Sequence, residues 1–527
     1  MPEVTISFPS HGAADTAARA IFASLAGPGG TGTRMAIEAT LAESGLALSD
    51  PRLTSLNQFL SKRGFNDPIA FEDIAPAILG VSTTLLGRAL RGELVIPDFS
   101  AFSQRLGEIF ESVRSNRDGN VASYIPQLAR VDPDAFAMAV CTVDGQQFAL
   151  GDTDQYYCVQ STCKPINYAI AHDRLGGDAV HRHVGREPSG RSFNEITLNS
   201  RGLPHNPMIN AGAIACASLI APELSPADRF DSIIKTWRGL CGGGGVGFDN
   251  AVFLSERDTA DRNFALAYFM RENGAFPAST DLHATLDLYF QCCSITVNAP
   301  QMGLIAATLA NGGVCPTTNE RIFNSDSVKN CLSLMASCGM YDFSGEYSFT
   351  VGLPAKSGVS GALFITIPGL CGIAIWSPRL DALGNSVRGV EFSRRLTEEF
   401  AFHSFSDLVA DSRKNNPRRS STESSVDEAM HLCAASSKGD INELRRLVAR
   451  NVDINLADYD GRTALHLAAS DGRADAVHFL LERGANADVV DRWGNRPLDD
   501  AERGGHAEII AALQPATPAR KRTAKAA

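Results

Sequence analysis

Apolar residues recur at intervals of three and four through the first part of the chain, in RMAIEATLAESGL, PRLTSLNQFLSKRG, FEDIAPAILGVSTTLLGRAL and DFSAFSQRLGEIFESVR. This spacing places apolar side chains along one face of an α-helix. Asp50-Pro51 and Pro97-Asp98 have the composition of helix starts. The pattern therefore predicts a helical N-terminal domain over residues 34–118, after a flexible, Gly- and Ala-rich segment over residues 1–33.

The segment GFNDPIAFED lies between two of these predicted helices, where an EF-hand carries its calcium loop. It lacks the D-x-[DN]-x-[DN]-G series of ligands that such a loop needs. We therefore expect an EF-hand-like arrangement of helices without a calcium site.

Residues 119–407 combine two kinds of pattern. Strand-like apolar runs occur near both ends of this segment, as FAMAVCTV at the start and as ALFITIP and GLCGIAIWS at the end. Helical stretches such as AGAIACASLIA, ADRNFALAYFMREN and QMGLIAATLANGG fill the middle. Strands from both ends around a helical middle predict one α+β domain whose sheet joins the two ends.

A repeat follows a linker in the last part of the chain. Residues 408–427 are charged and Ser-rich without an apolar period, which predicts the linker. Beyond it, Gly439, Gly472 and Gly505 are spaced by 33 residues, and DGRTALHLAA is echoed by WGNRPLDDA. This period resembles ankyrin repeats and predicts an all-α domain of three copies over residues 428–515.

Such a stack binds a protein partner or orders an oligomer, and the sequence leaves both roles open. The basic residues 516–527 form either a solvated tail or a nuclear address.

The chain is acidic, with 48 Lys and Arg against 59 Asp and Glu and a formal net charge of −11. A general binder of nucleic acid or of anionic membranes would carry a basic excess, so neither partner is expected. The sequence has no secretory pattern, and no apolar run reaches the roughly 18–20 residues of a membrane helix. The 12 cysteines form no pair of CxxC motifs for zinc and fit free thiols in a reducing compartment. We expect a soluble intracellular protein without a metal, with the cytoplasm as the favoured location.

Ser161 and Lys164, in YCVQSTCKPINYAI, are a candidate nucleophile and base. Positions three apart share a helix face, and a lysine whose pKa is lowered by burial can take the proton of a serine hydroxyl. A helix start at this point, which Pro165 favours, would also stabilise a developing oxyanion. Ser232 and Lys235 have the same spacing, so the alternative is a helix-capping serine near a solvated lysine.

A second motif favours the catalytic interpretation. Lys356-Ser357-Gly358, in LPAKSGVSG, precedes the strand-like ALFITIP. Enzymes of the serine β-lactamase and penicillin-binding group combine S-x-x-K with a later K-[ST]-G beside the nucleophile. The two motifs occur here in that order and predict a β-lactamase-like domain, although KSG alone is also typical of a turn before a strand.

Seven segments together resemble one enzyme family: VASYIPQLA, QSTCKPINYAI, HNPMINAGAI, SERDTADRNFALAYF, LDLYFQCCSI, LMASCGMYDFSGEY and GLPAKSGVSG. In this order they are similar to the serine-dependent glutaminases. The helical N-terminal region and the ankyrin repeats resemble those of the animal kidney- and liver-type enzymes, so the resemblance extends from about residue 34 to about residue 513. It implies hydrolysis of L-glutamine to L-glutamate and ammonia, without a cofactor, by a homotetramer or a higher assembly. It also makes a mitochondrial location an alternative, although the N-terminus has no clear transit peptide.

The resemblance implies a role for each matching residue. Ser161 is the nucleophile and Lys164 its base, while Tyr341 assists proton transfer to the leaving ammonia and Tyr124 contributes a further hydroxyl. The backbone N–H groups of Ser161 and Val359 form the oxyanion hole. Four residues hold the α-amino and α-carboxylate groups of the substrate: Asn210, Glu256, Asn263 and Tyr289. Taken singly, these four also fit a helix cap, a solvated helix face or a core tyrosine.

Two other functions share parts of this pattern. A penicillin-recognising hydrolase or esterase would use S-x-x-K and K-S-G without the four substrate-holding residues. An ankyrin scaffold with an inactive enzyme domain would lack a catalytic residue, and none is missing. The sequence favours a glutaminase in which Ser161 attacks the side-chain amide, a γ-glutamyl acyl-enzyme forms, and water then releases glutamate.

Overall fold

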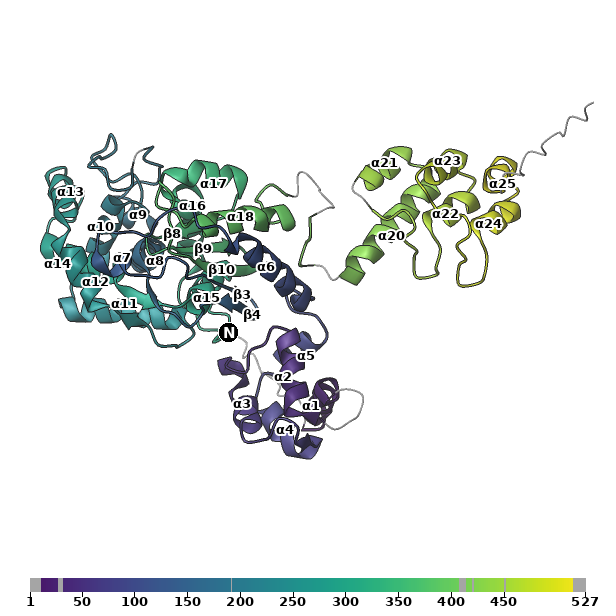
Figure 1. The fold of residues 1–527 in the computed structure, drawn as a ribbon, viewed down its shortest axis with the longest axis horizontal. Coiled ribbons are helices and arrows are strands. Elements are labelled where there is room, and N and C mark those ends of the chain that lie inside the picture. The colour runs from purple at the N-terminus through teal and green to yellow at the C-terminus, as the bar shows by residue number, and fades with distance from the viewer. Residues whose placement is uncertain are drawn as a thin grey trace, which may run out of the picture. The chain divides into compact units, whose positions relative to one another are not determined.

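The computed structural model describes residues 11–26, 32–190, 192–406, 414–418, 421–449 and 452–514. The chain divides into two compact units, Met1–Phe405 and Ser406–Ala527 (Figure 1). The predicted basic tail over residues 516–527 lies outside the described residues, as does the start of the predicted N-terminal segment. Within the described part, no helix combines the length and the apolarity that crossing a bilayer requires.

The first part of unit one is helical, as the apolar spacing predicts. Asp50 accepts a hydrogen bond from a backbone N–H at the start of η1, and Asp98 does so at the start of α6, so both predicted helix starts are confirmed. A two-residue antiparallel pairing joins β1 to β2. The elements are α1 (His11–Ala26), β1 (Gly32–Thr33), α2 (Arg34–Glu43), η1 (Pro51–Leu53), α3 (Thr54–Leu60), β2 (Pro68–Ile69), α4 (Phe71–Leu79), α5 (Thr83–Leu90) and α6 (Phe99–Arg114).

Helix α1 corrects the prediction of a flexible segment over residues 1–33. Its side chains Ile21, Phe22 and Leu25 are buried in the core that α2 to α5 also form, and α1 packs on α4 and α5. Most of the stability of a helix in a folded protein comes from packing of its apolar face, so these contacts stabilise α1. The sequence pattern alone could not reveal the partner helices.

The predicted joining of the two ends of the α+β domain is confirmed by a five-stranded antiparallel sheet. Its order is β4-β3-β10-β9-β8, so strands from the two ends of the domain pair directly through β3 and β10. The strands are β3 (Ala137–Thr142), β4 (Gln147–Gly151), β8 (Ala355–Ser357), β9 (Ala362–Ile367) and β10 (Cys371–Trp376).

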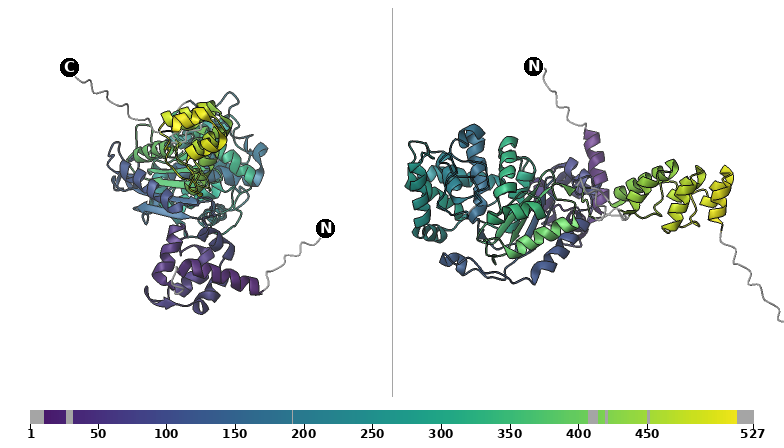
Figure 2. Two further views of the ribbon diagram at one scale, coloured as in Figure 1. Left: turned by 90° about the vertical axis from the view of Figure 1, so that its right-hand side faces the viewer. Right: turned by 90° about the horizontal axis from the view of Figure 1, so that it is seen from above.

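The sheet is covered on both faces. Along β3, Ala137 and Ala139 belong to one core while Met138 and Val140 belong to another, as the two-residue period of a strand requires. Helix α15 (Ala299–Ala310) packs on β3, β9 and β10. Helix α6 lies beside α18 (Val387–Glu399) and the two contribute to the second core (Figure 2). The central strands are therefore buried throughout.

The segment between β4 and β8 is mostly helical, as the sequence predicts, and it carries the candidate site. A small antiparallel sheet of order β5-β7-β6 lies within it. Its elements are β5 (Tyr157–Cys158), η2 (Gln160–Thr162), α8 (Cys163–Leu175), α9 (Gly177–Val180), α10 (Asn210–Leu219), α11 (Pro226–Leu240), β6 (Gly247–Phe248), α12 (Asn250–Asp258), α13 (Asp261–Glu272), α14 (Leu282–Cys293), β7 (Ile295–Val297), α15, α16 (Ser325–Cys338), η3 (Tyr341–Phe343) and α17 (Ser344–Thr350), with α7 (Pro126–Ala129) before β3.

The described residues of unit two include three helix pairs that share a core of their own. Gly439, Gly472 and Gly505 each lie between the two helices of a pair with φ near +70°, a conformation that favours glycine. This repeated turn accounts for the 33-residue spacing in the sequence. The helices are α20 (Ser421–Lys438), α21 (Ile441–Ala449), α22 (Ala464–Ser470), α23 (Ala474–Glu482), α24 (Pro497–Gly504) and α25 (Ala507–Leu513).

The start of α20 corrects the predicted linker over residues 408–427. The helix begins at Ser421, within that segment. Serine, threonine and acidic residues are favoured in the first turns of a helix, so STESSVDE reads as a helix start as well as a linker. Residues 408–413 and 419–420 of the segment lie outside the described part of the chain.

Candidate active site

Ser161 and Lys164 meet at the start of helix α8. Ser161 lies in η2, and Lys164 lies in the first turn of α8. The Lys164 Nζ donates a hydrogen bond of 2.5 Å to the Ser161 Oγ, and both residues are buried. The other S-x-x-K pair forms no such contact: the Ser232 Oγ donates to a backbone carbonyl of its own helix, and Lys235 is exposed. The shared spacing therefore leads to two different environments.

Burial favours the neutral form of Lys164. The residue is 1% exposed, and desolvation lowers the pKa of its amine below the ordinary value of 10.5. Smaller effects of Cys293, Cys163 and Glu256 oppose this shift. A neutral amine in contact with a hydroxyl is what a general base requires.

Tyr341 adds a buried phenol to the site. Its hydroxyl has no hydrogen-bond partner among the described residues. The neighbouring Ser161 side chain tends to lower the pKa of this hydroxyl. Burial raises the pKa of Tyr341 above its ordinary value of 10.0, so the phenol keeps its proton. The site thus contains a proton donor whose hydrogen bond is not committed elsewhere.

The backbone is strained at two positions of the site. Gln160 has φ +48° and Tyr341 has φ +54°, and only four non-glycine residues have positive φ in the part of the chain that the structure describes. This region costs on the order of 1–2 kcal/mol for a residue with a Cβ. Strain of this kind clusters where surrounding packing fixes a functional geometry. Gln160 directly precedes Ser161, so the strained turn orients the candidate nucleophile.

The K-S-G motif ends beside this turn. A Cβ on Gly358 would lie 3.0 Å from the carbonyl oxygen of Val159 and 3.1 Å from the Cγ2 of Thr162, so glycine permits the close approach. The N–H of Val359, the next residue, donates no hydrogen bond to a described residue. An uncommitted backbone donor next to the Ser161 turn is a component that an oxyanion hole needs.

Tyr124 and Glu256 form one hydrogen-bond network with Gln160. The Tyr124 hydroxyl donates to Glu256 Oε1 at 2.5 Å, and the Gln160 Nε2 donates to the same oxygen at 3.0 Å. Burial raises the pKa of Glu256, while these two hydrogen bonds and Lys164 oppose the shift. The structure therefore places the Tyr124 hydroxyl at the Glu256 carboxylate, although about half of the residue's surface is exposed.

Asn210, Asn263 and Tyr289 form a second network. The Tyr289 hydroxyl donates to Asn210 Oδ1 at 3.2 Å, and the Asn210 Nδ2 donates to Asn263 Oδ1 at 3.1 Å. The Lys164 Nζ lies 5.7 Å from the centre of the Tyr289 ring, which joins this network to the Ser161 pair. The network presents neutral donors of the kind that suit a carboxylate.

A cavity of about 340 Å³ reaches Tyr341. It is lined by Pro188, Ser189, Gly190, Phe193, Asn206, Met208, Ile209, Ser337, Cys338, Tyr341, Asp342, Ser344 and Gly345. Its volume is typical of a small-molecule site. Within the described residues, no group of three or more His, Cys, Asp or Glu side chains is arranged to hold a metal ion.

Two residues of the site have no individual role in the sequence-based prediction, which includes Lys356 only as part of the K-S-G motif. Gln160 bonds to the Glu256 carboxylate and carries the strained turn. Lys356 is fully buried, donates to the carbonyl oxygens of Gly339 (3.1 Å) and Ser357 (2.6 Å), and lies 4.4 Å from the centre of the Tyr341 ring. In the sequence, Gln160 could have been found because it is next to Ser161, and Lys356 because it belongs to the K-S-G motif.

Family models match both units of the chain. The model described as Glutaminase matches residues 119–405, and that described as Ankyrin repeats (3 copies) matches residues 430–521. The predicted three-copy ankyrin domain is thus confirmed.

The chain is 46% identical over 486 residues to "Putative glutaminase 3" of Caenorhabditis elegans, covering 90% of this chain and 83% of the relative. It is 44% identical over 478 residues to "Glutaminase liver isoform, mitochondrial" of Rattus norvegicus, covering 90% and 79%. Among solved structures it is similar to probable glutaminase ybaS, with 35% identity and a TM-score of 0.56 over 58% of this chain and 99% of that one. Mglu in its native form matches with 39% identity and a TM-score of 0.54, over 57% and 72%.

The matches confirm the resemblance that the seven segments indicated, including the likeness to animal enzymes that covers most of the chain. The chain therefore belongs to the glutaminase family of amidohydrolases and carries ankyrin repeats at its C-terminal end.

Proposed function

We propose that the chain hydrolyses the side-chain amide of L-glutamine through a γ-glutamyl ester on Ser161. The observation that carries this mechanism is the 2.5 Å hydrogen bond between the buried Lys164 amine and the Ser161 hydroxyl at the start of α8. The similar protein Mglu has been solved in its glutamate form, which supports an amino-acid ligand of this size in such a domain.

The acylation step begins with a proton transfer from Ser161 to Lys164. The Ser161 oxygen attacks the amide carbon, and the carbonyl oxygen becomes an oxyanion that the N–H groups of Ser161 and Val359 stabilise. The amide nitrogen takes a proton from Tyr341, which regains one from Lys164, and ammonia leaves. Lys164 returns to the neutral form, so the base is ready for the second step.

Deacylation repeats the sequence with water as the nucleophile. Lys164 takes a proton from the water, the hydroxide adds to the ester carbon, and the Ser161 oxygen leaves and is reprotonated. The products are L-glutamate and ammonia, and neither step uses a cofactor.

The two networks hold the head group of the substrate. Glu256 supplies the negative charge that an α-ammonium group requires, while Asn210, Asn263 and Tyr289 supply hydrogen bonds to the α-carboxylate. A substrate fixed at this end must reach Ser161 with its amide, so the shorter asparagine is disfavoured.

The finer description of the fold is also part of the proposal. The antiparallel sheet with helices on both faces, the S-x-x-K motif on a helix and the K-S-G motif on the edge strand β8 support a β-lactamase-like catalytic domain. The helices around the β1–β2 pairing support an EF-hand-like outline for the N-terminal region.

We further propose a homotetramer, or a higher assembly, whose ankyrin repeats bind a protein partner or order the oligomer. All 12 cysteines are free, which supports an intracellular reducing compartment. The cytoplasm is favoured, and the mitochondrion is the alternative because the rat relative is named mitochondrial. Light scattering of the purified chain and imaging of a tagged chain test these points.

The activity is tested by measuring ammonia release from L-glutamine and from L-asparagine with the purified full-length chain. We expect turnover of L-glutamine at a kcat/KM at least about 100-fold above that for L-asparagine. Nitrocefin hydrolysis without ammonia release would instead identify a penicillin-recognising hydrolase. Inactivity towards all three substrates would favour the scaffold interpretation.

Replacing Tyr341 by phenylalanine is expected to lower kcat for L-glutamine by about 100-fold with little change in KM, because the proton donor is lost while the ring remains. Steady-state kinetics at several pH values measure this. The matched control is Tyr347→Phe, which removes another buried phenol that interacts with Ser393. Equal losses in both variants would show a structural effect rather than proton transfer.

Replacing Glu256 by glutamine is expected to raise KM for L-glutamine by about 100-fold, because the α-ammonium group loses its carboxylate partner. The amide keeps an acceptor for Tyr124, so the fold is expected to survive. Asp258→Asn, two positions away on the exposed face of α12, is the control. An unchanged KM in Glu256→Gln would remove Glu256 from the head-group site.

A further inference from the structure

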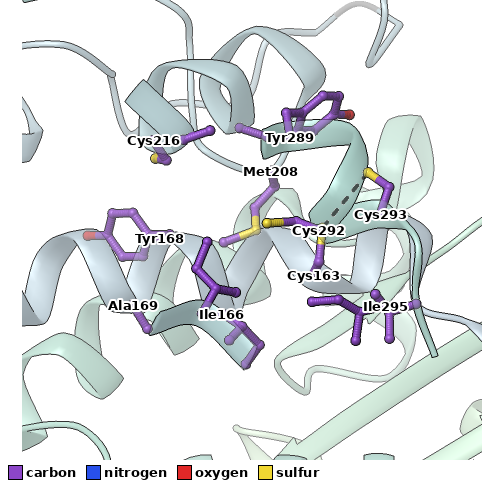
Figure 3. Packing of buried hydrophobic residues seen from close by; sticks show 14 of the residues in the cluster. Cys163, Ile166, Tyr168, Ala169, Met208, Cys216, Tyr289, Cys292, Cys293 and Ile295 are labelled. Atoms are coloured by element: carbon purple, nitrogen blue, oxygen red, sulfur yellow. Dashed lines mark hydrogen bonds between the residues drawn. The ribbon is translucent and has the colours of Figure 1, made fainter. Parts of the chain in front are cut away.

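Two thiols face each other beside the candidate nucleophile. The Sγ atoms of Cys163 and Cys293 are 4.0 Å apart, and the dashed line in Figure 3 marks this contact. Both residues are buried, at 0% and 4% exposure. The pair joins positions 130 residues apart in the sequence, so only the fold brings the two sulfurs together.

Each thiol is tied to a part of the active site. Cys163 stands between Ser161 and Lys164 in the chain and is the first residue of α8. Cys293 is the last residue of α14, one turn after Tyr289. Helix α14 packs directly against η2, which carries Ser161. A bond between the two sulfurs would therefore link the nucleophile segment to the substrate-holding helix.

The geometry of the reduced pair differs from that of a disulfide. A disulfide requires an S–S distance of about 2.05 Å, so the sulfurs must approach by roughly 2 Å. Because Cys163 is the first residue of α8 and Cys293 the last of α14, the bond would tie the first turn of α8 to the end of α14. Lys164 lies in the same turn, and its hydrogen bond to the Ser161 Oγ depends on the position of that turn.

We propose that Cys163 and Cys293 form a reversible oxidation site, in which a peroxide converts the facing thiols to a disulfide that disrupts the Ser161–Lys164 contact. The effect on catalysis rests on the proposed function of that pair, whereas formation of the disulfide does not.

The chemistry needs one equivalent of hydrogen peroxide. One thiol attacks a peroxide oxygen, the O–O bond breaks, and a sulfenic acid and one water form. The second thiol then attacks the oxidised sulfur and expels the oxygen as a second water, which leaves the S–S bond. Two thiols are oxidised and the peroxide is reduced to two waters. A thiol reductant reverses the reaction by exchange.

The buried environment of the two thiols makes the oxidation slow but does not prevent it. The hydrogen bond with Cys163 and burial raise the pKa of the Cys293 thiol, and Lys164 opposes these effects. A buried, protonated thiol reacts slowly with oxidants, but the facing partner captures the sulfenic acid once it forms. Cys292 is the competing neighbour, since it also lies in this cluster (Figure 3).

The test treats the reduced full-length protein with hydrogen peroxide and follows ammonia release and non-reducing peptide mapping in parallel. We expect a cross-linked Cys163–Cys293 peptide to accumulate as activity falls by about 100-fold, the scale that a 1 Å displacement of a reacting group can produce. Dithiothreitol is expected to restore activity and to remove the cross-linked peptide.

Two variants separate this site from general oxidation. Cys163→Val and Cys293→Ser are each expected to resist peroxide inactivation, whereas Cys216→Ser, at another buried thiol of the same core, is expected to remain sensitive. Loss of activity without the cross-linked peptide would overturn the proposal, and so would pair variants that peroxide inactivates as readily as the wild type. Absence of the peptide after peroxide treatment of the wild-type protein would overturn it as well.

The two readouts keep this proposal apart from the function itself. If the reduced protein released no ammonia from L-glutamine, the proposed function would fail, and peptide mapping would still decide whether the disulfide forms. If the reduced protein were active and no disulfide formed, only the oxidation site would fail.

Discussion

Substitution of Ser161 by alanine is expected to lower kcat for L-glutamine hydrolysis by about 10⁴-fold or more, because no acyl-enzyme can form without the hydroxyl. The Oγ is the atom that lies 2.5 Å from the Lys164 Nζ, and a methyl group cannot replace it in attack on an amide carbon. Ammonia release over hours by the purified full-length variant measures the residual rate.

Ser232→Ala is the matched control for this experiment. Ser232 has the same spacing to a lysine, but its hydroxyl donates to the backbone of its own helix, so its loss is expected to leave kcat within about two-fold of the wild type. Thermal unfolding shows whether both variants keep the fold. A folded Ser161→Ala protein with wild-type activity would refute Ser161 as the nucleophile.

The fold was largely predictable because its main elements follow local patterns. The helices over residues 34–118 were predicted from their three-and-four apolar spacing, and β3, β9 and β10 from their apolar runs. Each of these predictions depends only on residues within the element itself. The 33-residue repeat was predictable for the same reason, because Gly439, Gly472 and Gly505 occupy the same turn in successive helix pairs. Helix α1 was missed because its burial depends on contacts with α4 and α5.

The candidate site was less predictable than the fold. The spacing of Ser161 and Lys164 is common, and this pair differs from Ser232 and Lys235 in its burial and in the hydrogen bond between its two side chains. Burial depends on how the whole domain packs, so a four-residue motif does not predict it. The positive φ of Gln160 could not be predicted from the sequence either, because glutamine is not a residue that favours this conformation.

Replacing Lys164 by methionine is expected to lower kcat by about 10³- to 10⁴-fold, because the variant lacks the base that takes the proton of Ser161. The pH profile provides a second readout. Burial lowers the pKa of Lys164 below its ordinary value of 10.5, and the neutral amine is the active form. The wild-type rate should therefore rise with pH through the pKa of Lys164, and this acidic limb should be absent from the residual activity of the variant.

The same substitution is expected to stabilise the fold at neutral pH, because Lys164 is held where its charged form is disfavoured. Since its pKa is lower in the folded than in the unfolded state, the unfolded chain binds the proton more strongly below pH 10.5. The free energy of unfolding of the wild type should therefore rise with pH from the lowered pKa towards 10.5, and the advantage of the variant should shrink over that range. Thermal unfolding from pH 6 to pH 10, with the exposed Lys235→Met as control, measures this. A Lys164→Met protein that is both inactive and less stable than the wild type at pH 7 would mean that the lysine supports the packing of α8, and the loss of activity would then not identify a base.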